Sequence, residues 1–372
     1  MREGWRRVRL KEVARLDLDQ VPVRPGNAYA IAGVWNAGQG LFARSTIKGS
    51  ETTYQTLHRL RAGQLVMRKL TAWEGTITTV SPEFAGCFVS PEFPTYTLAP
   101  GLQPGFMRLV CQRKELWEAL RDVSTGTVQR RKRVNPRRLL EIEIDLPPVA
   151  VQRRIADVLA AIDAVTAEAT RLASQADIAV SSTRREVLES VPNRVRLADA
   201  LRLHRGYDLP AQDRREGSVL VIASGGPVGT HDAAMVRGPG VVTGRSGTIG
   251  RVFMVGDDFW PLNTTLFVED FKRNDPRFVR HLLIDLRLER FAGGSTVPSL
   301  NRNVLDSELV AVPTIERQGQ VAALLDALER EAECARGIAA RTAELRRALL
   351  ADLLSGDHEI PSSYDRFLDG AA

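Results

Sequence analysis

Residues 152–189 read QRRIADVLAAIDAVTAEATRLASQADIAVSSTRREVLE and contain neither glycine nor proline. Apolar and small side chains recur there at alternating steps of three and four, the heptad pattern of a helix that packs along a partner. These positions are Ile155, Val158, Ile162, Val165, Ala169, Leu172, Ala176 and Ala179. At about 1.5 Å per residue, such a helix reaches roughly 55 Å. The stretch therefore predicts one long helix.

The same pattern returns 166 residues later. It places at the matching positions Val321, Leu324, Leu328, Glu331, Ala335, Ile338, Thr342 and Leu345. The preceding residues match at the same offset, pairing Pro147 with Pro313, Gln152 with Gln318 and Asn135 with Asn301. Glu331 and Thr342 weaken the second seam, so we expect the two helices to pack antiparallel on each other. Two amphipathic helices packed on separate domains are the alternative.

Each long helix follows a globular segment, and the two segments share short motifs. Val8-Arg9-Leu10-Lys11-Glu12 resembles Val195-Arg196-Leu197-Ala198-Asp199, and Gly75-Thr76-Ile77 resembles Gly247-Thr248-Ile249. The segments contain short apolar runs broken by Gly and Pro, typical of strands and turns, and a helix is expected at 278–291. The predicted organisation is a globular segment (1–149), a long helix (150–190), a second globular segment (191–317), a long helix (318–356) and an acidic tail (357–372). The expected fold class is mixed α/β, with an internal pseudo-twofold repeat.

Composition excludes several classes of protein. The chain has 372 residues, of which 44% are hydrophobic and 26% charged, an ordinary composition for two or three globular domains. No uncharged apolar run approaches the roughly 18 residues of a membrane span, and the N-terminus lacks the apolar stretch of a secretory signal. Cys87, Cys111 and Cys334 lack disulfide or zinc-site spacing. We expect a reduced, cytoplasmic protein.

Positive charge is concentrated outside the two helices. Residues 1–149 carry 23 cations and 14 anions, residues 191–317 carry 17 and 15, and each helix segment carries 5 and 6. Of the 51 basic residues, 45 are Arg. Arginine suits bidentate contacts to phosphate and guanine, although a GC-rich genome would produce the same bias. We expect the first globular segment to contribute more of the nonspecific attraction to phosphates.

Two related globular segments alternating with two long helices resemble the specificity subunit of type I restriction-modification systems. The helix starts LPPVAVQRRIADVLAAID (146–163) and VPTIERQGQVAALLDAL (312–328) are similar to the family's proline-rich lead, Gln and apolar helix. The segments GVVTGRSGTIGRVFMVGDDFWPLNTTLFV (240–268) and GGSTVPSLNRNVLDSELVAVP (293–313) resemble its target-recognition domain. The resemblance covers nearly the whole chain. GCFVSPEFPTYTL (86–98) lacks the Asn-Thr-Thr of the second domain, which we interpret as a different specificity.

The resemblance implies a function in DNA recognition. Each target-recognition domain would read one half of an asymmetric, bipartite duplex target, and the helix pair would fix the distance between the halves. Helices of roughly 55 Å span at most about 16 base pairs at 3.4 Å each. The resemblance also implies partners: two methyltransferase (modification) subunits that use S-adenosylmethionine, and restriction/translocase subunits. Docking is expected at the helix starts, through Pro147, Gln152, Ile155, Leu159, Pro313, Gln318, Val321 and Leu325.

Candidate DNA contacts lie in both target-recognition domains. In the first they are Arg68, Lys69, Thr127, Gln129, Arg130, Arg131, Lys132 and Arg133, where four consecutive cations in TVQRRKRVN would attract phosphates. A solvated basic turn is the alternative interpretation. In the second they are Arg245, Ser246 and Thr248 on a Gly-rich turn, with Asn263, Ser299, Asn301, Arg302 and Asn303. Asn263 suits a buried turn equally well.

Motifs for catalysis are missing from the sequence. GRSGTIG (244–250) lacks the Lys-Ser/Thr of a phosphate-binding loop, and no Asn-Pro-Pro-Tyr motif of an adenine methyltransferase is present. The five His residues show no metal-ligand spacing and no nuclease core is recognisable. We therefore expect a non-catalytic subunit without cofactor or metal. Two alternatives remain: a divergent single-chain DNA-modifying enzyme, and a scaffold whose domains bind proteins rather than DNA.

Overall fold

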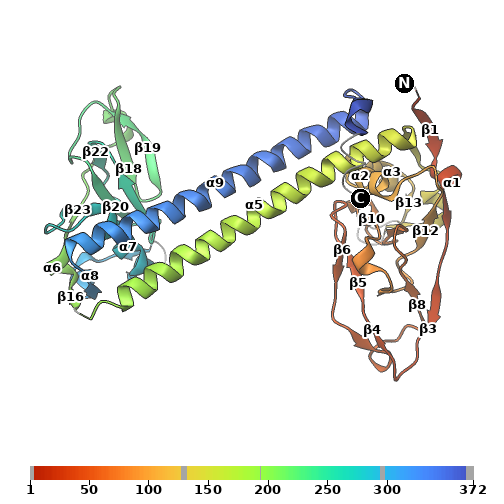
Figure 1. Ribbon diagram of the computed structural model, residues 1–372, viewed down its shortest axis with the longest axis horizontal. Coiled ribbons are helices and arrows are strands. Elements are labelled where there is room, and N and C mark those ends of the chain that lie inside the picture. Colours follow the sequence, from red (N-terminus) through yellow and green to blue (C-terminus); the bar gives the residue numbers. More distant parts are fainter. Residues whose placement is uncertain (1–3, 127–131, 193, 294–297, 366–372) are drawn as a thin grey trace. The chain divides into compact units, whose positions relative to one another are not determined.

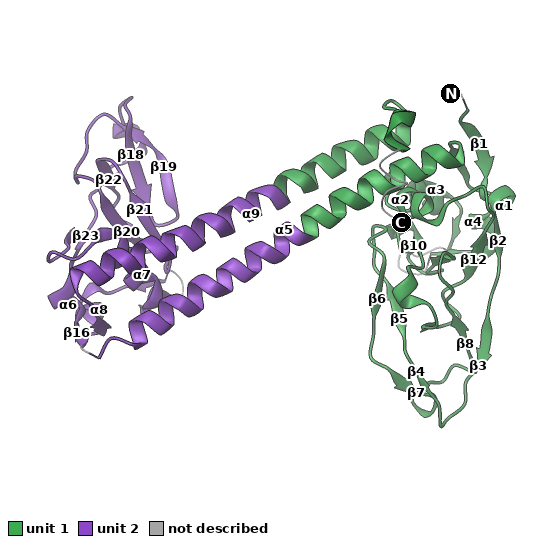
Figure 2. Cartoon of the chain, in the orientation of Figure 1, with its two compact units in different colours: residues 1–167, 340–372 green, residues 168–339 purple. Residues whose placement is uncertain are grey.

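The computed structural model describes residues 4–126, 132–192, 194–293 and 298–365 (Figure 1). The chain divides into two compact units (Figure 2). Unit 1 comprises residues 1–167 and 340–372, and unit 2 comprises residues 168–339. Each unit therefore combines one globular domain with a part of each long helix, α5 (Val149–Glu189) and α9 (Ile315–Ser355).

Unit 1 is built around a four-stranded antiparallel sheet. Its strands are β1 (Arg6–Arg9), β2 (Ala14–Leu16), β3 (Gln20–Pro22), β4 (Ala28–Tyr29), β5 (Ala32–Val34), β6 (Leu41–Ala43), β7 (Ile47–Lys48), β8 (Thr56–Arg59), β9 (Leu65–Met67), β10 (Ile77–Thr79), β11 (Phe88–Val89), β12 (Thr95–Leu98), β13 (Ser124–Thr125), β14 (Arg133–Val134) and β15 (Glu143–Leu146). Its helices besides α5 and α9 are α1 (Leu10–Val13), α2 (Pro104–Val110), α3 (Lys114–Asp122) and α4 (Pro136–Leu139). The main sheet has the order β10-β9-β12-β2, and a smaller sheet has the order β11-β8-β3. Phe106 of α2, Leu116 of α3 and Leu159 of α5 share one core with the main sheet.

Unit 2 repeats this plan. Its strands are β16 (Arg194–Arg196), β17 (Arg202–Arg205), β18 (Val219–Ala223), β19 (Gly226–His231), β20 (Gly240–Gly244), β21 (Val252–Val255), β22 (Phe259–Pro261), β23 (Thr265–Asp270), β24 (Ala292–Gly293), β25 (Ser299–Leu300) and β26 (Leu309–Ala311). Its helices besides α5 and α9 are α6 (Leu197–Ala200), α7 (Pro276–Asp285) and α8 (Arg302–Asp306). The main sheet has the order β17-β23-β20-β21, and Phe278 of α7 and Leu325 of α9 pack in its core.

The main sheets of the two domains correspond strand by strand. Reading β10-β9-β12-β2 against β21-β20-β23-β17 gives the same four-stranded sheet. The first strand of each domain leads into a four-residue helix and pairs with the strand that precedes the long helix, β1 with β15 and β16 with β26. The predicted mixed α/β fold with an internal repeat and two long helices is confirmed.

The long helices pack antiparallel within each unit. In unit 1 the Arg346 guanidinium pairs with Asp163, and the Thr166 hydroxyl lies 2.8 Å from that of Thr342. In unit 2 the guanidinium of Arg336 lies 2.8 Å from Asp177. The alternative of two helices packed separately is therefore wrong.

The predicted heptad seam is only half correct. The buried residues in the middle of α5 are Ala169, Ala173, Ala176 and Val180, so the buried series steps by four, three and four. Val165 and Leu172 are 51% and 43% exposed, although the pattern placed them in the seam. On α9 the exposed members are Leu324, Ile338 and Leu345. One series, Val158–Val165–Leu172–Ala179 with Leu324–Glu331–Ile338–Leu345, thus lies off the seam, and we call it the outward series.

Two further details of the fold concern helices. The helix expected at 278–291 begins at Pro276 and ends at Asp285, because Arg287 adopts a left-handed conformation with φ 49° and starts a separate 3-10 turn, Leu288–Phe291. No helix among the described residues is both long and apolar enough to cross a membrane.

Candidate nucleic-acid interface

In unit 1 the segment that follows β9 pairs with β14 and so brings together basic residues from two distant parts of the chain. The Val134 amide donates to the Lys69 carbonyl at 2.9 Å, and Leu70 and Arg133 form an isolated antiparallel bridge. This pairing places Arg68 and Lys69, which follow β9, next to Arg133 of β14. Thr127, Gln129, Arg130 and Arg131 lie outside the described residues, and Lys132 directly precedes β14. The described candidates Arg68, Lys69 and Arg133 therefore lie close together.

A pocket of about 580 Å³ opens at this place. Its lining includes Arg44, Arg68, Arg133 and Glu92, together with the aromatic ring of Tyr54. The carboxylate of Glu92 accepts a hydrogen bond from Arg133 Nη1 at 3.2 Å and lies 3.7 Å from Lys69 Nζ. Sequence reasoning missed Arg44, Glu92 and Tyr54, because only the strand pairing brings them to the basic residues.

The corresponding place in unit 2 also collects the predicted candidates. The Leu300 amide donates to the Arg245 carbonyl at 2.8 Å, and Ser246 forms a bridge with Ser299. Gly244 makes the tight turn possible, since a Cβ atom there would lie 1.7 Å from the Thr248 carbonyl oxygen. A pocket of about 370 Å³ is lined by Arg205, Arg245, Leu266, Ser299, Leu300, Asn301 and Arg302. Arg205 is a further guanidinium that the sequence did not single out.

Several polar candidates in unit 2 also make bonds within the chain. Asn301 caps α8, its side-chain oxygen accepting from the Asn303 amide at 3.0 Å, as Asn135 caps α4 in unit 1. Arg302 donates to the Leu203 carbonyl at 3.2 Å. The side-chain amide of Asn263 donates to the Asp208 carboxylate, and the backbone carbonyl of Asn263 accepts from Arg245 Nε at 3.1 Å. Asn263 thus orients Arg245, while Thr248, Ser299 and Asn303 are exposed.

The predicted docking residues lie where each long helix joins its own domain. Pro147, Gln152, Ile155, Leu159, Gln318, Val321 and Leu325 are buried within their own units, and Pro313 is half-buried. Gln152 donates to the carbonyls of Gly101 and Pro147 at 2.9 and 2.8 Å and accepts from the Gln103 amide at 2.8 Å. Gln318 makes the equivalent bonds to Asn274, Pro313 and Asp275. In this chain these side chains attach each long helix to its own domain, and docking of a partner through them stays a prediction.

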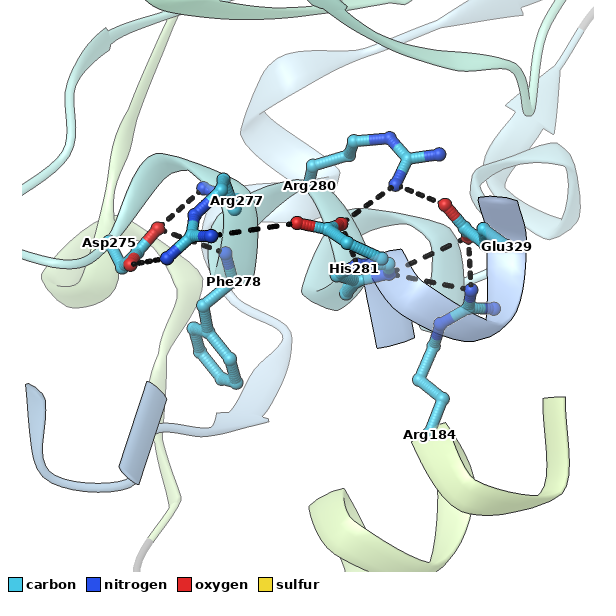
Figure 3. Close-up of polar contacts among 8 residues, drawn as sticks. Arg184, Asp275, Arg277, Phe278, Arg280, His281 and Glu329 are labelled. Carbon is cyan, nitrogen blue, oxygen red and sulfur yellow. Dashed lines mark hydrogen bonds and ion pairs between the residues drawn. The ribbon is translucent and has the colours of Figure 1, made fainter. Parts of the chain in front are cut away.

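Unit 2 contains a buried polar cluster where α7 meets both long helices (Figure 3). Glu329 of α9 accepts from Arg184 of α5 at 3.0 Å and from Arg280 of α7 at 2.6 Å. His281, which is 1% exposed, lies with Nε2 2.9 Å from Asp326 and Nδ1 3.5 Å from the Arg184 guanidinium. His281, Asp326 and Glu329 have ligand atoms close enough to share a cation. Arginines already compensate these acids, so the cluster is best explained as a structural connection between α7 and the helix pair.

The cluster predicts a pH dependence of stability. Burial lowers the pKa of His281 below its ordinary value of 6.5, against the opposing effect of Asp326. The folded chain therefore binds fewer protons than the unfolded chain just below pH 6.5, so the contribution of His281 is complete above that pH and is lost as the pH falls. We expect the free energy of unfolding of unit 2 to fall more between pH 7.5 and 5.5 in the wild-type chain than in the His281→Gln variant. Urea unfolding at the two pH values measures both losses. Equal losses would contradict this.

Comparisons with known proteins agree with the repeated fold. Residues 194–341 match the family model for the type I restriction modification DNA specificity domain. The crystal structure of the S subunit of a type I restriction-modification system from M. genitalium has 14% identity and a TM-score of 0.66, covering 94% of this chain and 96% of that chain. A chain from a structure described as the structural basis of complex assembly and conformational transition of the type I R-M system has 19% identity and a TM-score of 0.53, covering 96% and 99%. An HsdS subunit from Thermoanaerobacter tengcongensis has 18% identity and a TM-score of 0.48, covering 96% and 98%.

No curated protein matches the sequence significantly. The family model covers the second repeat, and the first repeat has the same sheet order and the same connection to its long helix. Residues 194–341 therefore match the family model of the type I restriction modification DNA specificity domain, and the chain shares the fold of the M. genitalium S subunit over nearly its whole length.

Proposed function

We propose that this chain is the sequence-specific double-stranded DNA-binding subunit of a type I restriction-modification complex, acting in the cytoplasm. The observation that carries the proposal is the repetition of a basic site at equivalent strand ends. Lys69 with Arg133 in unit 1 and Arg245 with Ser299 in unit 2 occupy matching places in two related domains. Guanidinium and ammonium groups at such a place suit contacts to phosphates and guanine.

The two sites differ in their side chains, which supports an asymmetric, bipartite target. Unit 1 has Glu92 between its cations, whereas the pocket in unit 2 is lined by three arginines together with Ser299 and Asn301. Identical sites would favour a palindromic target, while unlike sites favour two different half-sites. We propose that each domain reads one half-site and that the helix pair sets the distance between the halves.

The outward series on the helices is the surface that we propose for two modification subunits. Val165 and Leu345 in unit 1, and Leu172, Leu324 and Ile338 in unit 2, are exposed apolar side chains on nearly neutral helices. Because the series occurs once on each helix, it offers two similar surfaces to two similar partners. Methyl transfer from S-adenosylmethionine would then belong to the modification subunits, and cleavage to restriction/translocase subunits, leaving this chain non-catalytic.

The function is tested by selecting duplexes from a random pool with the chain and its modification subunits. We expect one split, asymmetric motif and an affinity that falls steeply with salt. Adenine methylation mapped in the source genome should lose the same motif when the gene is deleted. Binding without sequence preference would favour the protein-binding scaffold. Methylation or cleavage by the pure chain would favour the single-chain enzyme.

Docking is tested by placing a charge in the outward series. Leu172→Glu on α5 and Leu324→Glu on α9 should each weaken binding of one modification subunit by roughly thirtyfold or more, because a buried, unpaired carboxylate is costly at an interface. Native mass spectrometry should then show one modification subunit fewer with either variant. Val228→Glu, at an equally exposed apolar side chain of β19, is the control that should retain both. Retention of both subunits by the helix variants would exclude this surface.

A further inference from the structure

The pocket of unit 1 is lined both by arginines without an ion-pair partner among the described residues and by one arginine that is paired with a carboxylate. The side chains of Arg44 and Arg68 have no hydrogen-bond or ion-pair partner among the described residues, whereas Arg133 is held by Glu92 at 3.2 Å. An unpaired guanidinium on a flexible side chain attracts any nearby phosphate. A guanidinium paired with a carboxylate attracts phosphates less, because the pair is nearly neutral, but its orientation is fixed.

Fixed orientation is what a bidentate contact to a base requires. Glu92 uses Arg133 Nη1, and among the described residues Nε and Nη2 of Arg133 have no hydrogen-bond partner. The Arg133 side chain is 55% exposed at the pocket, so these remaining donors can be reached. Two parallel guanidinium donors match the O6 and N7 acceptors of guanine in the major groove.

The register of the two sheets shows where the domains differ at this place. Lys69 donates its amide to the Glu92 carbonyl at 2.8 Å, and Arg245 donates its amide to the Thr264 carbonyl at 2.8 Å. Glu92 and Thr264 are therefore equivalent positions, with a carboxylate in one domain and a hydroxyl in the other. Glu92 Oε2 is buried, and Oε1 is the atom that accepts from Arg133 Nη1 and lies near Lys69 Nζ, so we assign this carboxylate a role through Arg133.

We propose that Arg133, oriented by Glu92, reads a guanine in the half-site bound by unit 1, and that Arg44 and Arg68 contact phosphates. Arg133 is then a specificity-determining residue and Glu92 a positioning residue. This inference rests on the proposed function, because it assigns a base to one of the two DNA-reading sites. In unit 2 the position that corresponds to Arg133 is occupied by Ser299, so the inference concerns one half-site alone.

The experiment selects duplexes from a random pool with the complete complex, using the wild-type chain, four test variants and one control variant. Arg133→Ala should lower the preference for guanine at one position by roughly ten- to a hundredfold, leaving the other half-site unchanged. Arg133→Lys should not restore it, since an ammonium lacks the planar pair of donors. Glu92→Gln should weaken the preference at that same position. Arg68→Ala should instead weaken all duplexes equally and reduce the salt slope by about one.

Glu141→Gln is the matched control for Glu92. Glu141 lies 3.7 Å from Arg9 and 3.0 Å from Lys11, so it also joins two cations of unit 1, but it lies outside the pocket. The complex with the Glu141→Gln variant should have the same base preferences as the wild-type complex. If Arg133→Ala keeps the wild-type preferences and loses affinity for every duplex, Arg133 contacts a phosphate and the inference is overturned. If the wild-type complex selects no motif, the proposed function fails as well.

Discussion

Replacing Glu329 with alanine is expected to destabilise unit 2 by about 3–5 kcal/mol, the usual cost of removing one partner of a buried ion pair. Glu329 is the carboxylate that meets both Arg184 and Arg280, and the Arg184 side chain is only 9% exposed. Burial already lowers the pKa of Arg184, which shows how unfavourable its charge is without a counterion. In the Glu329→Ala variant this guanidinium stays buried but loses the carboxylate with which it is paired.

The same helix pair offers a matched control for this variant. Asp177 and Arg336 also join α5 to α9, at 2.8 Å, but their side chains are 58% and 49% exposed. Water screens such a pair, so Asp177→Ala should cost at most about 1 kcal/mol. Urea unfolding gives the total loss, and hydrogen exchange in α7 places the loss in unit 2. Equal losses from the two variants would show that the buried cluster adds no more than a surface pair.

The long helices and the internal repeat could be predicted because their signals are local or periodic. The stretch from Gln152 to Glu189 has no Gly or Pro, and its heptad pattern returns 166 residues later; neither signal requires knowledge of tertiary contacts. The face of the seam was harder to predict. Small or apolar residues occupy both the buried positions Ala173 and Val180 and the exposed positions Val165 and Leu172, so a heptad pattern alone does not separate the two faces. The burial of each side chain in the structure does separate the two faces. Glu331 is exposed, which explains why a charged residue is tolerated in the outward series.

The candidate sites were predictable only in part, for a related reason. Arg68, Lys69 and Arg133 are conspicuous as basic residues, and Arg245 and Ser299 lie in recognisable motifs. These residues lie together only because their strands pair, and neither of the two paired stretches of sequence indicates which stretch it will pair with. Glu92 is 41 residues from Arg133, and His281 is 45 residues from Asp326 and 97 from Arg184. Such partners become visible only when the register of the sheet and the packing of α7 are known.

The repetition of the two glutamines is visible in the sequence, but the hydrogen bonds that they make within the chain are not. The repeat matched Gln152 with Gln318, and both were expected to face a partner. A repeated polar residue at the start of a long apolar helix is as well explained by an internal contact as by an external one. The structure shows three hydrogen bonds for each side chain, all within its own unit.

Gln152→Ala is therefore expected to destabilise unit 1 by about 3 kcal/mol or more. Gln152 is 0% exposed, and its loss leaves the Gly101 and Pro147 carbonyls and the Gln103 amide without this partner. Each buried polar group left unsatisfied costs about 1–3 kcal/mol. Gln152→Glu should be at least as damaging, because a carboxylate has no hydrogen to donate and would face two carbonyl oxygens.

The control for Gln152 lies on the same helix. Gln175 of α5 is exposed and accepts a hydrogen bond from the exposed side chain of Arg171, so Gln175→Ala should change stability by no more than about 0.5 kcal/mol. Hydrogen exchange should show faster opening of α2 in Gln152→Ala, because Gln103 precedes that helix and loses its bond to α5. Gln318→Ala should have the same effect on α7, through Asp275. If Gln152→Ala left α2 protected and instead weakened binding of the modification subunits, the glutamine would be a docking residue after all.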